Sequence, residues 1–456
     1  MTRSHSLYIP EKVIDVVEVG HKASGDHLQL DLSKDIKFST TALESYAFAR
    51  WEPLIYDAMI VAAVIEFGDR AVKRPPRGWA RRISLSIPVH DPERWSTPEV
   101  LTSLVDTIEF LTGDYWEFSF VKRSSPAPAP SQEYLDLPVK SQAILAYSDG
   151  MDSRAVAGIL GSTLRDGLVR VRVGSKTSDH FSSLDRRQPF TSVPYSITLN
   201  RAARETSARN RGFRFALISA IAAYLTGAND IVIPESGQGA LGPALVTVGH
   251  AYPDYRNHPL FTTRMERFVR ALLGHTVHYI FPRLWHTKGE TLREFVELKG
   301  DSEWRSTRSC WRNSQWSSAD GKLRQCGVCA ACMLRRLSVH AAGLQESHDT
   351  YICVDVEAPT LTEAVDANFT KLNSSYEQYA IAGALHMDHM ADMAEEDARS
   401  ILMRHAALIA PLLGLTADDA YKRLQHLFGR HSIEWNNFVN SAGARSFIRQ
   451  WVRAGS

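Results

Sequence analysis

A short apolar strand, a loop of serine and glycine, and a helix follow one another between residues 143 and 164. Ala143–Tyr147 has the length and apolar character of a strand, and Ser153–Leu164 is typical of a helix. The loop between them, Ser148-Asp149-Gly150-Met151-Asp152-Ser153, brings the unpaired N–H groups and the positive end of the helix dipole to one point. This order of elements predicts an anion-binding loop at the carboxyl end of a strand.

The residues of the loop fit that chemistry, and they also fit a simpler structure. Gly150 permits backbone angles closed to other residues, and the hydroxyls of Ser148 and Ser153 can donate hydrogen bonds. Asp152 can orient the loop or bind Mg²⁺. An ordinary strand-to-helix turn, in which aspartate and serine cap the helix, explains the same residues. Both interpretations stay open on the loop alone.

The following segments continue the alternation of strands and helices. Val169–Val173, Ile231–Ile233 and Tyr279–Phe281 are predicted strands, and Arg211–Leu225 is a predicted helix. Strands that alternate with helices imply a parallel sheet covered on both faces. We therefore predict an α/β fold over residues 139–355.

Two further regions flank this domain. Residues 1–122 mix predicted strands with predicted helices and are interpreted as an α+β module. Residues 123–138 contain a Pro/Ala/Ser stretch, Ser124–Ser131, that predicts a linker. Residues 356–456 are predicted to be helical, with four aromatic side chains that pack this tail onto the body. The segments and side chains concerned are Leu28–Leu32, Ile83–Pro88, Tyr115–Val121, Leu54–Phe67, Pro98–Leu111, Glu396–Ala410, Ala417–Phe428, Trp435, Phe438, Phe447 and Trp451.

Four of the five cysteines fall within 23 residues, at Cys310, Cys326, Cys329 and Cys332. Four thiolates are the number that a closed tetrahedral zinc site requires, and Gly327 lets the chain curl so that three of them converge. A redox-active CxxC pair and an iron–sulfur cluster are the alternatives. We predict structural zinc, with Cys353 a core residue.

Size and charge exclude several other classes of protein. At 456 residues the chain has room for two or three domains, and its net charge of +1 gives no overall attraction to nucleic acid. The longest apolar stretches are shorter than the roughly 20 residues of a membrane span. The first residues lead into no signal-peptide core. We therefore expect a cytoplasmic protein without membrane contact.

The order of residues in the loop resembles the SGGxDS motif of the PP-loop ATP pyrophosphatases, which cleave ATP to AMP and pyrophosphate. The matching positions are Ser148, Gly150, Asp152 and Ser153. The loop departs from the motif at Asp149, where that family has glycine. A carboxylate there repels pyrophosphate unless it turns outward or meets a metal ion.

The loop and the cysteines together resemble the 7-cyano-7-deazaguanine synthase (QueC) family of this superfamily, over about Ser141–Gly343. The resemblance rests on the loop and on Arg209-Asn210-Arg211, Thr287-Lys288-Gly289-Glu290, Ser309-Cys310, Cys326-Gly327-Val328-Cys329-Ala330-Ala331-Cys332 and Arg335. The chain is similar to the enlarged members encoded in bacterial antiphage operons, because its first 120 residues and its tail are not part of the small family enzyme. The resemblance implies an adenine nucleotide alpha-hydrolase-like, Rossmann-like domain with structural zinc beside the active site.

The same resemblance implies an ATP-dependent ligase that adenylylates a carboxylate, 7-carboxy-7-deazaguanine or similar, and passes it to ammonia or to an amine on a macromolecule. ATP, Mg²⁺ and structural Zn²⁺ are the implied cofactors. Tyr147 to Ser153 and Glu235 are the expected nucleotide-binding residues; Ser148, Asp152, Ser153, Lys288 and Arg211 are the expected catalytic residues. Surface charge is the alternative for Lys288 and Arg211, and a helix cap for Glu235.

Two other functions compete with the ligase. One is a PP-loop sulfurtransferase acting on tRNA, which needs a reactive cysteine or a labile cluster. The other is a nucleotide-binding, non-catalytic subunit of a defence complex. The flanking regions are the expected contacts for a protein partner encoded nearby.

Overall fold

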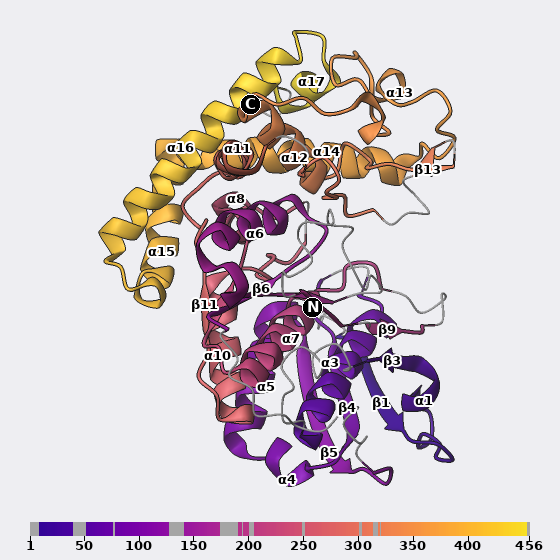
Figure 1. Ribbon diagram of the computed structural model, residues 1–456. Helices are drawn as coiled ribbons and strands as arrows, with labels where there is room; N and C mark the ends of the chain where they lie inside the picture. Colours follow the sequence, from indigo (N-terminus) through magenta and orange to yellow (C-terminus); the bar gives the residue numbers. More distant parts are fainter. Residues whose placement is uncertain are drawn as a thin grey trace, which may run out of the picture. The chain divides into compact units, whose positions relative to one another are not determined.

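The computed structural model of the protein describes residues 9–39, 52–75, 78–126, 141–173, 190–193, 195–199, 205–248, 251–300, 303–312, 318–319 and 321–453. The chain forms two compact units (Figure 1). The first unit contains Met1–Tyr147, Leu164–Ile233 and Asp254–Ile280, and the second contains Ser148–Thr163, Pro234–Pro253 and Phe281–Ser456. Most of the predicted linker, including 127–138, lies outside the described residues.

The N-terminal part of the first unit contains a four-stranded sheet in the order β2-β1-β4-β5. All its strands are parallel, a direction that the sequence pattern did not predict. The strands are β1 (Glu11–Val17), β2 (Leu28–Asp31), β4 (Arg82–Val89) and β5 (Tyr115–Lys122). Three of these were predicted to within two residues, whereas β1, which opens with two charged residues, was missed. The helices of this part are α1 (Leu32–Asp35), α3 (Pro53–Ala71), α4 (Pro92–Trp95) and α5 (Pro98–Thr112).

A second sheet of the first unit has five strands in the order β11-β10-β6-β7-β8 and is parallel throughout. Its strands are β6 (Ala143–Ala146), β7 (Leu168–Val173), β8 (Phe190–Val193), β10 (Asp230–Val232) and β11 (His278–Ile280). Ile144, Leu145 and Ile231 are fully buried, as expected for a parallel sheet that is covered on both faces. The α/β fold predicted for this region is confirmed.

The remaining elements of the first unit include two long helices, α7 (Arg211–Thr226) and α10 (Pro259–Leu273). Each ends at a glycine with positive φ, Gly227 and Gly274, which closes the helix without the steric cost a side chain would carry. The short elements are β3 (Ile36–Phe38), β9 (Tyr195–Ile197) and η1 (Arg165–Gly167). Strands β3 and β9 pair antiparallel.

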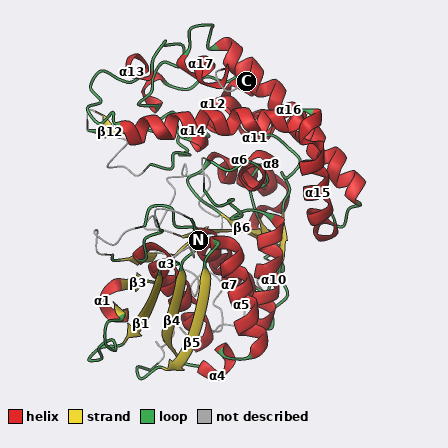
Figure 2. Cartoon of the chain, turned by 180° about the vertical axis from the view of Figure 1, so that it is seen from behind, coloured by secondary structure: helices red, strands yellow, loops and turns green. Residues whose placement is uncertain are grey.

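The regular elements of the second unit are almost all helices, joined in places by long loops (Figure 2). Its longer helices are α6 (Met151–Leu164), α11 (Lys288–Lys299), α12 (Ala330–Ala341), α14 (Ser374–Ala391), α15 (Arg399–Ile409) and α16 (Ala417–Ser441). Its shorter elements are α8 (Gly237–Ala240), α9 (Gly242–Leu245), β12 (Ser318–Ala319), β13 (Lys322–Leu323), η4 (His348–Thr350), α13 (Leu361–Ala364), η5 (Asp392–Ala394), η6 (Glu396–Ala398), η7 (Pro411–Leu413) and α17 (Phe447–Arg453). The predicted helical C-terminal region is confirmed, although α16 runs 13 residues beyond the predicted end at Phe428.

One apolar core joins the C-terminal helices to the segment that carries the cysteines. The rings of Trp435 and Phe438 stack with their centroids 5.8 Å apart, and both side chains are buried, as predicted. Helix α14 approaches that segment closely because it has Gly383 at the contact, where any Cβ would overlap the carbonyl oxygen of Val328. The tail is therefore part of the core of the second unit. None of the helices in the described part of the chain is long and apolar enough to cross a membrane.

Candidate functional site

The predicted phosphate loop lies between the end of β6 and the start of α6, and its own side chains hold it in shape. The hydroxyls of Ser148 and Ser153 lie 3.0 Å apart and share a hydrogen bond. The N–H of Gly150 donates to the Ser148 hydroxyl at 3.1 Å, and the Ser153 hydroxyl donates to the Ser148 carbonyl at 2.9 Å. A Cβ at Gly150 would lie 3.0 Å from the Ser148 hydroxyl, so a larger residue here would press on this network.

The first turn of α6 leaves three backbone donors available. Within the described residues, the N–H groups of Met151, Asp152 and Ser153 make no hydrogen bond, and the first backbone bond of this helix runs from Arg154 to Gly150. Three convergent N–H groups at the positive end of a helix favour an anion such as phosphate. The loop residues that the sequence singled out therefore form an anion-binding geometry.

The structure brings two of the predicted catalytic residues into direct contact. The ammonium group of Lys288 forms an ion pair with Oδ2 of Asp152, and each side chain is only 8% exposed. The other oxygen, Oδ1, is buried and has no hydrogen-bond partner in the described part of the chain. A buried carboxylate oxygen without a donor is costly, and it is a suitable ligand for a hard cation such as Mg²⁺.

Packing between α6 and α11 produces this contact. Asp152 and Lys288 lie in the first turns of the two helices, and the ring of Phe295, two turns further along α11, lies against Gly158 of α6. A Cβ at Gly158 would overlap that ring. Because both contacts lie at matching heights, the two helices run in the same direction, and both present the positive ends of their dipoles at the loop. The core between them includes Met151 and Leu292.

Further polar contacts fix the start of α11. Thr287 caps the helix, and Thr287 and Glu290 exchange the reciprocal hydrogen bonds of a capping box. The N–H of Lys288 donates to the side-chain amide oxygen of Gln238 at 2.7 Å. Gln238 was not predicted as a site residue, and no motif marks it.

Asp149, the position that departs from the PP-loop motif, is tied to the cysteine segment through its backbone. Its carbonyl oxygen accepts a hydrogen bond of 2.7 Å from the N–H of Arg308, two residues before Cys310. Asp149 as a whole is half-buried. The loop and the cysteine cluster are therefore adjacent parts of one unit.

Glu235 lies in the second unit, directly against α8. A Cβ at Gly239 would lie 2.5 Å from Oε2 of Glu235, so a larger residue there would displace this carboxylate group. Glu235 lies immediately before Ser236, the N-cap residue of α8, and its predicted substrate contact stays a prediction.

The other two predicted site residues belong to the first unit. Tyr147 is fully buried, and the guanidinium groups of Arg170 and Arg172 lie 5.4 and 5.2 Å from its ring centroid. These arginines, two residues apart on β7, were missed, although their spacing places them on one face of the strand. Arg211 begins α7 and is exposed to solvent, where both the predicted catalytic role and the surface-charge alternative remain consistent.

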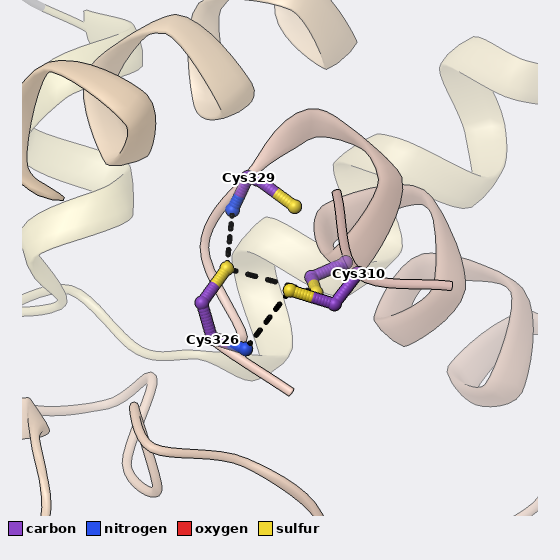
Figure 3. Close-up of side chains that lie close together, drawn as sticks. Cys310, Cys326 and Cys329 are labelled. Atoms are coloured by element: carbon purple, nitrogen blue, oxygen red, sulfur yellow. Dashed lines mark hydrogen bonds between the residues drawn. The ribbon is translucent and has the colours of Figure 1, made fainter. Parts of the chain in front are cut away.

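The four predicted cysteine ligands converge. Their sulfur atoms all lie within 4.8 Å of one another, and three of the four side chains are buried. Figure 3 labels three of these side chains, those of Cys310, Cys326 and Cys329, which lie close together. The sulfur atoms of Cys326 and Cys332 are 3.8 Å apart. A tetrahedral ion with bonds of about 2.3 Å to sulfur places its ligands about 3.8 Å apart. The donor set and spacing therefore fit a zinc ion.

Backbone geometry assembles this cluster. Gly327 has φ of +83°, in the left-handed region, which confirms the tight curl predicted between the first two ligands of the CGxC segment. The N–H of Cys326 donates to the sulfur of Cys310, and the N–H of Cys329 donates to the sulfur of Cys326, each at 3.3 Å (Figure 3). The neighbouring thiols hold the pKa of Cys310 far below its usual range, whereas burial raises the pKa of Cys332 well above it. Four thiols this close cannot all ionise without a cation.

Comparison with known proteins agrees with this geometry. Residues 184–343 match the profile of a family described as the queuosine biosynthesis protein QueC. The matched range contains the start of α7, the segment around Lys288 and all four cysteines, and it begins after the phosphate loop. No protein in the curated collection matches the chain. The predicted likeness to QueC is confirmed for this segment.

Proposed function

We propose that this chain, which carries a QueC-like segment, is an AMP-forming synthetase that adenylylates a carboxylate and passes it to a nitrogen nucleophile. The observation that carries the proposal is the buried Asp152–Lys288 pair, which lies where the open N–H groups of α6 converge. Lys288 comes from the matched segment and Asp152 from the loop outside it, so the contact joins the two features on which the proposal rests.

In the first step, a carboxylate oxygen of the substrate attacks the α-phosphorus of ATP, and the bond between this phosphorus and the bridging oxygen breaks. Negative charge grows on the departing pyrophosphate. The N–H groups of Met151, Asp152 and Ser153 and the ammonium group of Lys288 are fixed donors for that charge, and fixed donors stabilise a transition state without reorganisation. Mg²⁺ would neutralise phosphate charge, with Oδ1 of Asp152 as the protein ligand available to it.

In the second step, a nitrogen nucleophile attacks the acyl carbon, AMP leaves with the bonding electron pair, and the nitrogen loses a proton. The family likeness points to a carboxylated 7-deazaguanine as the acid and ammonia as the nucleophile. An amine on a macromolecule is the alternative acceptor, because the chain has a module and a tail outside the matched segment. A role in antiviral defence remains a prediction.

The cysteine cluster is proposed to hold zinc as a structural ion. Cys326, Cys329 and Cys332 are fully buried, which disfavours the sulfurtransferase alternative because a sulfur carrier has to reach its substrate. The non-catalytic alternative has one observation in its favour. The hydroxyls of Ser148 and Ser153 bond to each other, so they have to rotate before they can donate to a nucleotide.

The decisive experiment incubates the full chain with Mg²⁺, ATP, 7-carboxy-7-deazaguanine and an ammonium salt, and identifies the nucleotide products. We expect AMP and pyrophosphate in equal amounts. ADP and phosphate would exclude the mechanism, and ATP binding without turnover would favour the non-catalytic alternative.

A pair of variants tests the role of Lys288. Replacing a cation that neutralises transition-state charge costs about 100- to 1,000-fold in turnover, which is the expected result for Lys288→Met. Lys299→Met, at the other end of the same helix, is the matched control and should keep wild-type turnover. Equal turnover in the two variants would remove Lys288 from the mechanism.

A further inference from the structure

The C-terminal helix α16 contacts the start of α11 through residues one turn apart. Arg430 donates to Glu290 at 2.6 Å, and Thr287 donates to Glu434 at 2.6 Å. Helix α16 begins 74 residues beyond the end of the segment that matches QueC, residues 184–343. The two residues that cap α11, immediately around Lys288, are thus both held by a helix from outside the matched segment.

A second set of contacts reaches Lys288 itself through Gln238. The side-chain nitrogen of Gln238 lies 2.8 Å from Nδ1 of His431, and Nε2 of His431 lies 2.8 Å from the carbonyl oxygen of Met387. Gln238 and His431 are both buried. The same nitrogen of Gln238 donates to Glu434 at 3.3 Å.

The chemistry of these groups allows only one direction for each hydrogen bond. A carbonyl oxygen can only accept, so Nε2 of His431 carries the proton and Nδ1 accepts from Gln238. The amide oxygen of Gln238 then faces Lys288 and accepts its N–H. Burial lowers the pKa of His431 to about 4, which keeps the ring neutral, as this arrangement requires.

Close packing leaves the start of α11 little freedom to move relative to Gln238, His431 and Glu434. A Cβ at Gly289 would lie 2.9 Å from the Cβ of Ala341 and 3.2 Å from Oε1 of Glu434, so α11 can approach α12 and α16 only because residue 289 is glycine. At Gly237 a Cβ would overlap the carbonyl oxygen of Leu284. The Thr-Lys-Gly-Glu segment is therefore fixed from three sides.

We propose that Glu434, His431 and Gln238 are positioning residues that set the start of α11, so that Lys288 meets Asp152 at the phosphate loop. The three act through Thr287, which donates to Glu434, and through the N–H of Lys288, which donates to Gln238. The C-terminal helix α16 thereby helps to position a residue of the proposed active site. The inference deepens the proposed function and depends on it for its activity readout.

The ionisation of Glu434 gives this inference a signature that a purely structural role lacks. Burial, together with the nearby charge of Glu290, raises the pKa of Glu434 to about 7, against the favourable effects of Thr287, Gln238 and Arg430. His431, on the same helix, is neutral. Because the pKa is raised in the folded state, the contribution of Glu434 to stability is complete below its unfolded pKa and is lost as pH rises through about 7. Its ionised form, which holds Thr287 and Gln238 best, is the form that costs stability.

The test compares the full-length chain with Glu434→Gln. We expect turnover of Glu434→Gln to fall about tenfold at pH 8, because small displacements of a catalytic group have large effects on rate. The urea midpoint of the variant at that pH should equal or exceed the wild-type midpoint. Wild-type turnover should fall as pH drops through about 7, and the variant should lose this dependence.

Trp435→Phe is the matched control, since it removes a hydrogen bond of 2.8 Å from the neighbouring residue of α16 to Asp388 on α14. It should leave turnover unchanged. A second variant, His431→Leu, removes the acceptor of Gln238 and should lower turnover like Glu434→Gln. If turnover in the Glu434 and Trp435 variants falls only in proportion to their stability, the positioning role is wrong.

Hydrogen exchange separates failure of this inference from failure of the proposed function. The backbone N–H of Lys288 should lose protection in the Glu434 and His431 variants and keep it in Trp435→Phe, whether or not the protein turns over ATP. Unchanged protection of that N–H in all variants would overturn the inference. A wild-type protein that forms no AMP would overturn the proposed function alone.

Discussion

The two units each contain a buried ion pair, but the pairs differ in how many of their polar atoms are satisfied. In the first unit Arg81 is fully buried, and its five N–H groups all have acceptors, on the carboxylates of Asp69 and Asp114 and on the carbonyls of Asp69 and Val72. The remaining oxygen of Asp69 accepts from the N–H groups of Arg209 and Asn210. In the second unit the Asp152–Lys288 pair keeps one carboxylate oxygen without a donor among the described residues.

This difference separates an ion pair that only stabilises the fold from one that can also bind a ligand. When every donor of the buried arginine already has an acceptor, the pair has no free group for a ligand. It fixes the elements that it joins, here α3, β4 and the start of α7. A pair with an unused buried oxygen carries a cost that a ligand can remove. The cysteine cluster belongs to the second kind, because its thiols are satisfied together only when an ion is bound.

The largest expected effect follows from removing that ion. Cys329→Ser should abolish binding of one zinc per chain and destabilise the second unit cooperatively, since binding free energies of structural zinc reach about 10 kcal/mol or more in small peptides. Metal analysis and thermal unfolding measure the two effects. Cys353→Ser is the control, because Cys353 is fully buried but lies outside the cluster, and it should keep the full zinc content. Iron in the purified protein would contradict the zinc assignment.

Breaking the saturated cluster should have the next largest effect on stability. Arg81→Met removes one of the two cations that pair with Asp69 and Asp114 and leaves only Arg74, 2.8 Å from Asp114 and 3.7 Å from Asp69. Breaking a buried pair of this kind costs about 3–5 kcal/mol. Urea unfolding measures this loss. Arg82→Met, next to it, removes an exposed pair with Glu117 and an exposed contact with the ring of Tyr115, and should cost less than about 1 kcal/mol. Similar losses of unfolding free energy in Arg81→Met and Arg82→Met would contradict this prediction.

The smallest expected effect concerns Glu18, a carboxylate of the first unit. Hydrogen bonds from Ser124 and Ser125 outweigh the effect of burial and lower its pKa to about 2. Because the folded pKa is depressed, this contribution to stability is present above the unfolded pKa of about 4.5 and is lost as pH falls through about 2. Glu18→Gln should therefore be less stable than wild type by about 1 kcal/mol at pH 7 and approach it in acid. Acid unfolding curves of the two proteins give this comparison; a constant difference across pH would contradict it.

Much of the fold could be predicted because its signals are local. The strands of the parallel sheet are near-continuous apolar runs, and the predicted ends of β6, β7, β10 and β11 lie within one residue of the observed ends. Strand β1 was missed because Glu11 and Lys12 interrupt its apolar pattern. The direction of strands in the N-terminal sheet could not be predicted, since side-chain alternation is the same in parallel and antiparallel strands.

The residues of the candidate site also fall into those that the sequence predicts and those that it does not. The loop and the cysteines are predicted because each forms a short motif of neighbouring residues. Lys288 was found only through a family resemblance, because 136 residues separate it from Asp152. Gln238, His431 and Glu434 were missed, as no spacing links a glutamine on one short helix to two residues on a distant one. Their role follows from hydrogen-bond geometry, which only the folded chain provides.

Ser148–Thr163 belongs to the second unit, although most of that unit follows much later in the chain. This order has a consequence for folding during synthesis. Synthesis proceeds from the N-terminus, so Asp152 leaves the ribosome 136 residues before Lys288. At about 5–20 residues per second, that interval is roughly 7 to 27 s. During this time α6 has neither α11 nor the cysteine segment to pack against, while β6 and β7 on either side of it can already pair. The phosphate loop is therefore completed late in translation, after most of the first unit has been synthesised.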